Sequence, residues 1–233
     1  MAPTPTRGRC SVLRDAWLMA GKDLRLEWRS RVVLNQIAPL ALLFLVLFAF
    51  ALDPNRGVLD QATPGLFWIA VLFCGLLAIQ RAFALEAADG NRDALRMSGL
   101  EPGGIFLGKF VAIAAQLLAL EALLVVGVVI LYSTRLDGLG LLALTCVVAT
   151  AAIAAAGTLY GVLAAGLRVR ETLLPLLLLP VLAPVLLGST RAFEAALGGI
   201  PADGWPWVGL IAIFALVYVG AGIAAFGPLM EET

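Results

Sequence analysis

Six long apolar stretches, separated by short polar segments, make up most of the chain. A helix that crosses a bilayer needs about 20 mostly apolar residues. Turn-forming sequences bound three of the stretches: Asp53-Pro54-Asn55 follows the first, Thr63-Pro64-Gly65 opens the second, and Gly227-Pro228 closes the last. The pattern predicts an all-α integral membrane protein with six transmembrane helices, at about residues 34–52, 65–83, 104–131, 139–167, 173–187 and 208–226.

The fifth stretch, residues 173–187, is the shortest and contains Pro175, Pro180 and Pro184. Proline inside a helix removes a backbone donor and kinks the chain, so these three residues are predicted helix-breaking positions. Two interpretations stay open: an ordinary kinked span, and a discontinuous helix beside a transport pathway. Apolar residues at helical spacing in residues 188–204 suggest a short helix that dips into the outer leaflet.

The distribution of basic residues predicts the orientation. With the N-terminus in the cytoplasm, thirteen lysines and arginines fall on the inner side and three on the outer side. This bias agrees with the positive-inside rule. We therefore expect a multi-pass protein of the bacterial cytoplasmic (inner) membrane, with both termini in the cytoplasm.

The first 31 residues form a polar tail that carries seven basic side chains. Apolar residues recur in it at steps of three and four, which predicts an amphipathic helix lying flat at the inner membrane surface. Glu27 is the exception within its apolar arc. The chain thus divides into a cytoplasmic tail, residues 1–31, and a six-span transmembrane domain, residues 32–233. The apolar stripe comprises Leu13, Ala16, Trp17, Ala20, Leu24 and Trp28, and the basic side comprises Arg14, Lys22, Arg25 and Arg29.

Composition excludes several classes of function. The chain has no histidine and only three scattered cysteines, which argues against a metal site, a disulfide framework or haem-iron ligation by histidine. Its formal net charge is zero, so no basic field points to nucleic acid. No GxxxxGK[ST] loop and no nucleophile paired with a base is present, so we expect neither an enzyme nor a chain that hydrolyses ATP by itself.

Polar residues between the second and third spans form the most informative loop. Asp89-Gly90 predicts a turn, and Glu86, Asp93 and Leu95 flank it in a segment able to form a short helix. Such a helix is suited to docking on a cytoplasmic partner, although a solvated connection explains the same spacing. Arg81 and Lys109 lie near the inner interface, where snorkelling of their side chains is a sufficient explanation.

Glu121 is the only carboxylate well inside a predicted span. An ionised carboxylate is costly there, so Glu121 is expected to be protonated, paired or facing a polar cavity. A role in a proton or substrate pathway and a buried, neutral, hydrogen-bonded residue both remain open.

Several segments together resemble the haem exporter protein B (CcmB) family of cytochrome c maturation, in an order that covers nearly the whole chain from about residue 12. Each matching motif is short, and their joint order and spacing carry the resemblance. The motifs are Lys22-Asp23-Leu24 with Glu27 and Arg29; Pro64-Gly65-Leu66-Phe67-Trp68; Phe83 with Glu86, Asp89, Gly90 and Leu95; and Leu179-Pro180 with Pro184 and Gly188.

The resemblance implies an ABC-type permease subunit with a fold similar to type-2 exporters. It implies a separate ATPase subunit that binds ATP, a haem-handling membrane protein, a small accessory membrane subunit and a periplasmic haem chaperone, with membrane lipid around them. Residues Glu86, Asp89, Gly90, Asp93 and Leu95 would then belong to a coupling helix seated in the ATPase. Haem would be the substrate of the complex and not a cofactor of this chain, guided by apolar and aromatic surfaces such as Phe67 and Trp68.

Two alternatives remain beside this interpretation. One is a type-2 ABC permease for another substrate, such as a lipid or a drug. The other is a membrane scaffold that assembles other subunits and transports nothing. The partners that accompany the chain discriminate between them.

Overall fold

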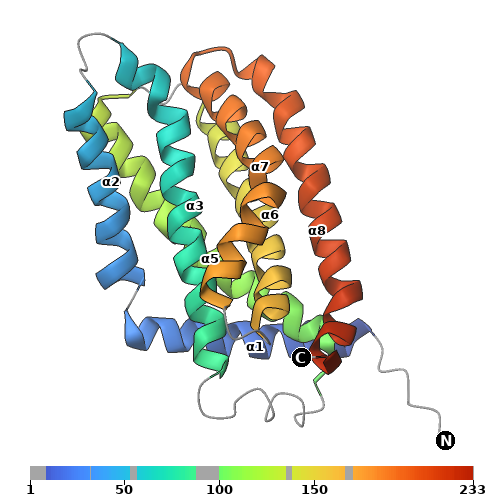
Figure 1. Ribbon diagram of the computed structural model, residues 1–233. Coiled ribbons are helices and arrows are strands. Elements are labelled where there is room, and N and C mark those ends of the chain that lie inside the picture. The colour runs from blue at the N-terminus through green and yellow to red at the C-terminus, as the bar shows by residue number, and fades with distance from the viewer. Residues whose placement is uncertain are drawn as a thin grey trace, which may run out of the picture.

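The computed structural model describes residues 9–31, 33–52, 57–87, 100–134, 138–165 and 170–232, and every regular element in these ranges is a helix. Long helices stand side by side, and α1 (Arg9–Ser30) lies across one end of them (Figure 1). The upright helices are α2 (Ala38–Ala51), α3 (Val58–Ala87), α5 (Pro102–Tyr132), α6 (Leu139–Ala165), α7 (Arg170–Leu197) and α8 (Trp205–Glu232). The last turn of α8 lies at the same end as α1, which we call the α1 end of the bundle.

The upright helices have the length and composition of membrane spans. Within the described residues, α3, α5, α6, α7 and α8 are each long and apolar enough to cross a bilayer. The shorter α2 follows a π-helical segment, η1 (Val33–Ile37), so that helical residues run from 33 to 51. The structure therefore confirms an all-α integral membrane protein, with five helices that qualify singly and a sixth upright helix, α2, which is shorter.

Two helices run further than the turn signals predicted. Helix α3 begins at Val58 rather than at Gly65, because Asp60 lies in its positively polarised first turn and Leu59 is buried in the core. The Thr63 hydroxyl donates to the Leu59 carbonyl at 2.7 Å, within the same helix. Helix α8 likewise continues past Pro228, which lies inside it.

The three prolines of the fifth span do not break it. Pro175, Pro180 and Pro184 all lie inside α7, which continues to Leu197, so residues 188–197 complete this helix instead of forming a separate one. Only Pro201–Gly204 forms an additional short helix, the 3-10 segment η3. Without water in the hydrocarbon region, a backbone that leaves the helix loses its partners, and this cost holds the chain helical. The discontinuous-helix interpretation is therefore wrong for the described residues.

Helix α6 lies at the centre of the contacts, against α3, α5, α7 and α8. Its buried stretch consists largely of alanine, and Gly157 and Gly161 face Ile79 and Phe83 of α3 so closely that a side chain at either glycine would require the α3 side chain to move. Small residues allow helices in lipid to approach until their backbones nearly touch. Dispersion between closely packed side chains then replaces the hydrophobic effect as the source of cohesion.

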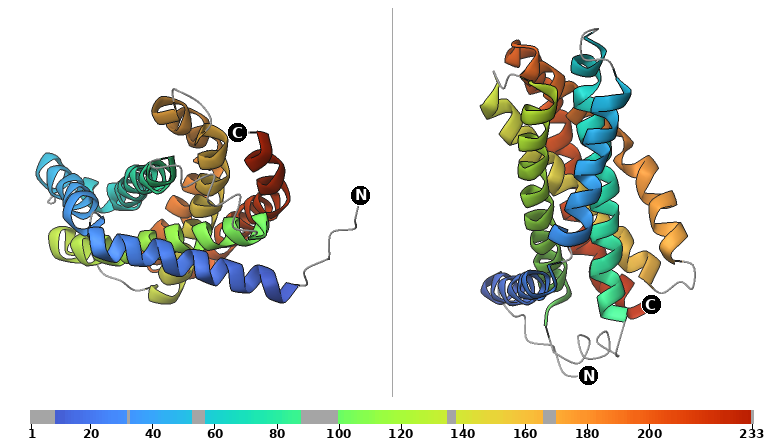
Figure 2. Two further views of the ribbon diagram at one scale, coloured as in Figure 1. Left: turned by 90° about the horizontal axis from the view of Figure 1, so that it is seen from below. Right: turned by 90° about the vertical axis from the view of Figure 1, so that its left-hand side faces the viewer.

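Glycine residues also allow close packing between α1 and α5, where the two helices cross. Figure 2 shows α1 lying against the side of α5 near the α1 end, at a steep angle to the spans. A Cβ atom added to Gly104 would lie 2.9 Å from the Asp15 Cβ, and one added to Gly108 would lie 2.8 Å from the Ala16 carbonyl oxygen. Glycines four residues apart on α5 therefore let α1 rest on its backbone.

Substitution of Gly108 by valine is expected to loosen α1 from α5. The added side chain overlaps the Ala16 carbonyl and Met19, and overpacking of this kind costs about 1–3 kcal/mol. Thermal unfolding of the purified chain in detergent measures the loss. Gly140→Val is the matched control, because a Cβ there meets nothing within 4 Å; an equal shift in both variants would contradict close packing at Gly108.

Candidate functional site

Three acidic side chains of α1 face the bundle and form the core of the candidate site. Asp15 is 3% exposed, and the side chains of Asp23 and Glu27 are 20% and 14% exposed. Their spacing of eight and four residues places Asp15 about two turns before Asp23, and Asp23 about one turn before Glu27, along one side of the helix. Each meets a group from α3 or from the start of α5, and we call this set of contacts the α1 clamp.

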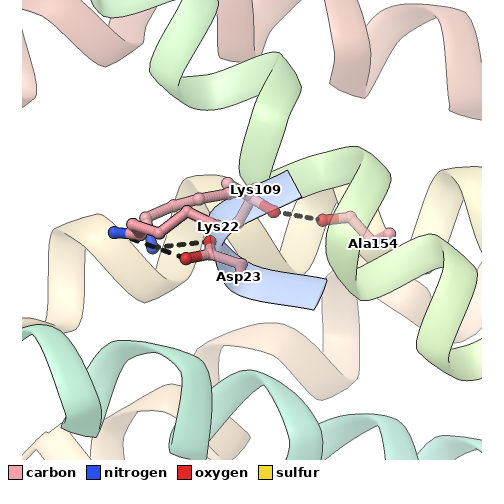
Figure 3. A network of polar contacts seen from close by, with 5 residues as sticks. Lys22, Asp23, Lys109 and Ala154 are labelled. Carbon is pink, nitrogen blue, oxygen red and sulfur yellow. Dashed lines mark hydrogen bonds and ion pairs between the residues drawn. The ribbon is translucent and has the colours of Figure 1, made fainter. Parts of the chain in front are cut away.

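The central contact of the α1 clamp joins Asp23 to Lys109 of α5. The Lys109 ammonium lies 3.9 Å from one Asp23 carboxylate oxygen, and Lys22 approaches the other at 3.4 Å (Figure 3). Lys109 is only 2% exposed and lies over the Phe83 ring of α3, 4.8 Å from its centroid. A buried ammonium is tolerated because opposite charge and an aromatic face compensate for the lost water.

Two outer contacts attach α1 to both ends of the polar loop. The Arg81 guanidinium of α3 lies 3.6 Å from the Glu27 carboxylate, an ion pair longer than a hydrogen bond. The backbone N–H of Glu101 donates to the Asp15 carboxylate at 3.3 Å, one residue before α5 begins. Because α3 leads into the loop and α5 leads out of it, α1 is fixed to both flanks of residues 88–99.

The residues predicted for coupling fall mostly outside the described ranges. Glu86 lies in the last turn of α3, and the helix ends at Ala87. Asp89, Gly90, Asp93 and Leu95 lie outside the described residues. The described structure therefore gives the flanks of this loop and their attachment to α1.

Glu121 is buried between α5 and α6, at 2% exposure. The Thr150 hydroxyl of α6 donates to its Oε1 at 2.5 Å, and the Cys146 thiol lies within hydrogen-bonding reach. Its Oε2 has no hydrogen-bond partner among the described residues. The structure thus shows Glu121 buried and hydrogen-bonded to Thr150, an arrangement that the sequence had left open. Among the described residues, no basic side chain forms an ion pair with Glu121.

Phe67 and Trp68 of α3 are fully buried rather than lining an open surface. Phe67 stacks on Phe193 of α7 with ring centroids 4.6 Å apart, and the Trp68 ring meets Phe193 edge-on at 6.2 Å. The indole N–H of Trp68 has no acceptor among the described residues. In this conformation the aromatic cluster packs α3 against α7.

Sequence reasoning missed the α1 clamp and misinterpreted its members. Glu27 looked like a defect in an apolar arc, and Lys109 and Arg81 looked like snorkelling cations. The structure corrects both views, because Glu27 pairs with Arg81 and Lys109 is buried beside Asp23. It also divides the predicted apolar stripe, since Ala16 and Ala20 are buried while the indoles of that stripe are exposed. The sequence features that could have predicted the α1 clamp are Asp15, Asp23 and Glu27 of α1 together with Gly104 and Gly108 of α5.

Removal of the Asp23 carboxylate is expected to destabilise the fold far more than removal of an exposed one. Asp23→Leu takes a counter-charge from a buried ammonium, at a cost of up to about 3–5 kcal/mol. Lys109→Met is expected to rescue it in the double variant, since both charges are then gone. Glu194→Gln is the control, because the Arg191–Glu194 pair is exposed and such pairs contribute about 0–1 kcal/mol. Unfolding curves in detergent give the change in the free energy of unfolding for each single variant, the double variant and the control. If the effects of Asp23→Leu and Lys109→Met simply add in the double variant, direct pairing of the two residues is contradicted.

Glu121→Gln is expected to leave abundance, stability and function unchanged, because the amide oxygen still accepts from Thr150. Thr150→Val removes the donor from a buried oxygen and is expected to cost about 1–3 kcal/mol. Unfolding curves and complementation of a deletion strain measure the two effects. Loss of function in Glu121→Gln at normal abundance would instead assign the carboxyl group a role in proton or substrate movement.

Comparison with known proteins places the chain in a family. The family model described as CcmB protein matches residues 14–228. The chain is 28% identical over 214 residues to heme exporter protein B of Paracoccus denitrificans, covering 88% of this chain and 92% of the relative. It is 27% identical to heme exporter protein B of Pseudomonas aeruginosa, over 89% and 94% of the two chains. The protein of the same name from Bradyrhizobium diazoefficiens is 30% identical, over 79% and 83%.

The match covers most of α1, the α1 clamp and almost all of the bundle. It therefore does not rest on the apolar composition of one or two spans. This multi-pass membrane protein belongs to the CcmB protein family.

Proposed function

We propose that the chain is the membrane permease subunit of an ABC-type complex that exports or releases haem for cytochrome c maturation. The observation that carries the proposal is the family match over residues 14–228, with relatives named heme exporter protein B. The all-helical bundle and its buried attachment of α1 support the permease part. In this proposal the chain is no enzyme, binds no cofactor of its own and acts on haem as cargo.

The energy source in this proposal is ATP bound by a separate ATPase subunit, since the sequence carries no phosphate-binding loop. The loop at residues 88–99, with Glu86 before it and Asp89, Gly90, Asp93 and Leu95 within it, would dock on that subunit. The α1 clamp supports this role, because Glu27, Arg81 and Asp15 tie both flanks of the loop to one helix. Displacement of the loop would therefore move α3, α5 and α1 together.

The orientation in this proposal places the α1 end in the cytoplasm and the opposite end in the periplasm. Among the described residues, the lysine and arginines of α1, together with Arg81 and Lys109, lie at the α1 end, in agreement with the positive-inside rule. The chain would lie in the bacterial inner membrane with both termini cytoplasmic, as a tail of residues 1–31 and a permease domain of residues 32–233. A haem-handling membrane protein, a small accessory subunit and a periplasmic haem chaperone would complete the pathway.

Handling of haem would rely on apolar and aromatic surfaces. The chain has no histidine, and the described residues contain no group of side chains suited to hold a metal ion. Phe67 and Trp68 pack with Phe193 between α3 and α7, toward the end opposite α1. Separation of these two helices would expose three aromatic rings to a planar, apolar cargo. Iron ligation would then belong to a partner.

The test is affinity purification of the tagged chain from its own membranes. We expect an ABC ATPase and a haem-handling membrane protein to accompany it, with haem absorbance in the sample. An ATPase without haem would favour a type-2 permease for another substrate, and the absence of an ATPase would overturn the permease role in favour of a scaffold.

The same purification tests the loop. Asp89→Lys with Leu95→Glu is expected to reduce recovery of the ATPase at least tenfold while the chain still inserts at normal abundance. Asp203→Lys, in η3 at the opposite end of the bundle, is the control and is expected to leave recovery unchanged. Unchanged recovery in the loop variant would overturn the coupling role of this segment.

A further inference from the structure

The side of α1 that faces away from α5 carries a hollow that the proposed function does not use. Its volume is about 400 Å³, within the range of small-molecule sites in proteins. Its lining includes Trp17, Leu18, Gly21, Lys22, Arg25 and Arg29, and we call it the α1 groove. Gly21 has no neighbour within 4 Å of an added Cβ, so the missing side chain opens the floor of the groove.

Charges on α1 are divided between its two sides. The acidic side chains Asp15, Asp23 and Glu27 face the bundle in the α1 clamp. The exposed guanidinium groups of Arg25 and Arg29 have no ion pair among the described residues. The α1 groove is therefore a concentrated positive surface, with its compensating negative charge turned inward.

Large apolar side chains lie exposed beside these cations, an arrangement that is unfavourable if only water surrounds the helix. Trp17 is 78% exposed and Leu18 is 58% exposed in the groove lining, and Trp28 is 82% exposed on the same helix. Exposed indoles on a helix lying across the end of membrane spans are typical of the boundary between headgroups and acyl chains. Figure 2 shows α1 at the outside of the bundle, against its end.

We propose that the α1 groove binds the phosphate headgroup of an anionic phospholipid. Arg25 and Arg29 contact the phosphate, Lys22 lies at its edge, and Trp17 and Leu18 contact the glycerol backbone and the start of the acyl chains. Arginine suits this task because its planar fork donates two parallel hydrogen bonds to phosphate oxygens. The inference rests on the proposed function only for the assignment of α1 to the cytoplasmic leaflet.

The test measures lipid that stays with the full-length chain after extraction. The chain is reconstituted in nanodiscs of phosphatidylcholine with 20% phosphatidylglycerol, transferred to mild detergent, and weighed by native mass spectrometry. Transfer to detergent removes the surface potential of the bilayer, so lipid that remains is held by local contacts. We expect phosphatidylglycerol to be retained in preference to phosphatidylcholine.

Matched variants distinguish a specific lipid site in the α1 groove from nonspecific electrostatic attraction of anionic lipid. Arg25→Gln with Arg29→Gln is expected to lower retention of phosphatidylglycerol at least tenfold, because two guanidinium groups lose their charge-assisted hydrogen bonds to the phosphate. Arg14→Gln with Arg31→Gln removes the same charge from α1 and the residue that follows it, outside the groove, and is expected to change retention less than twofold. Gly21→Leu fills the groove without loss of charge and is expected to lower retention at least fivefold.

The outcomes that overturn the proposal differ from those that overturn the permease function. Equal retention of the two lipids, or equal losses in the two double arginine variants, would show that no groove site exists. Retention unchanged in Arg25→Gln with Arg29→Gln, together with loss of a co-purifying protein, would assign the groove to a protein partner and overturn the lipid site. Selective retention by the isolated chain would support the site even if no ATPase or haem accompanied the chain.

Discussion

A backbone inside hydrocarbon must satisfy its own hydrogen bonds, and every described element of this protein obeys that constraint. It explains why α7 stays helical through Pro175, Pro180 and Pro184, since water offers no alternative partner at that depth. The Tyr218 hydroxyl of α8 donates to the Val181 carbonyl between two of these prolines, at 2.7 Å. The same constraint acts on side chains, because Thr145, Thr158 and Ser189 each donate to a carbonyl four residues earlier.

Once each span is a closed helix, assembly depends on how closely the helices approach. Glycine and alanine on α6 receive the bulky side chains of α3, and Gly108 of α5 receives α1. This second crossing brings three carboxylates of α1 to the ends of two spans. Burial of Lys109 beside Asp23 follows from that approach, because the ammonium lies between α1 and the Phe83 ring with little room for water. At the α1 end, the close packing of α1 on α5 therefore also produces the charge pairing.

The two sides of α1 connect the bundle to different surroundings. Its acidic side holds the flanks of the polar loop through Asp15 and Glu27, and its basic side carries the exposed Arg25 and Arg29, which face away from the bundle. A ligand in the α1 groove and a partner on the loop would therefore act on the same rigid element. Binding in the α1 groove would alter binding at the loop only if the α1 clamp transmits the movement of α1. Asp23 and Lys109, at the centre of the clamp, are the residues that would connect the two binding sites.

The sequence by itself determined the helical class, the membrane location and the approximate spans, because apolar runs of span length have one stable outcome in a bilayer. It also determined the absence of a phosphate-binding loop and marked Glu121 as exceptional. The tertiary structure alone decided that Glu27 and Lys109 form ion pairs, since their partners are distant in the chain. It showed equally that α7 runs unbroken to Leu197, because the penalty on an unpaired backbone in hydrocarbon outweighs the local effect of its three prolines. Packing of α3 against α7 decided that Phe67 and Trp68 are buried against Phe193.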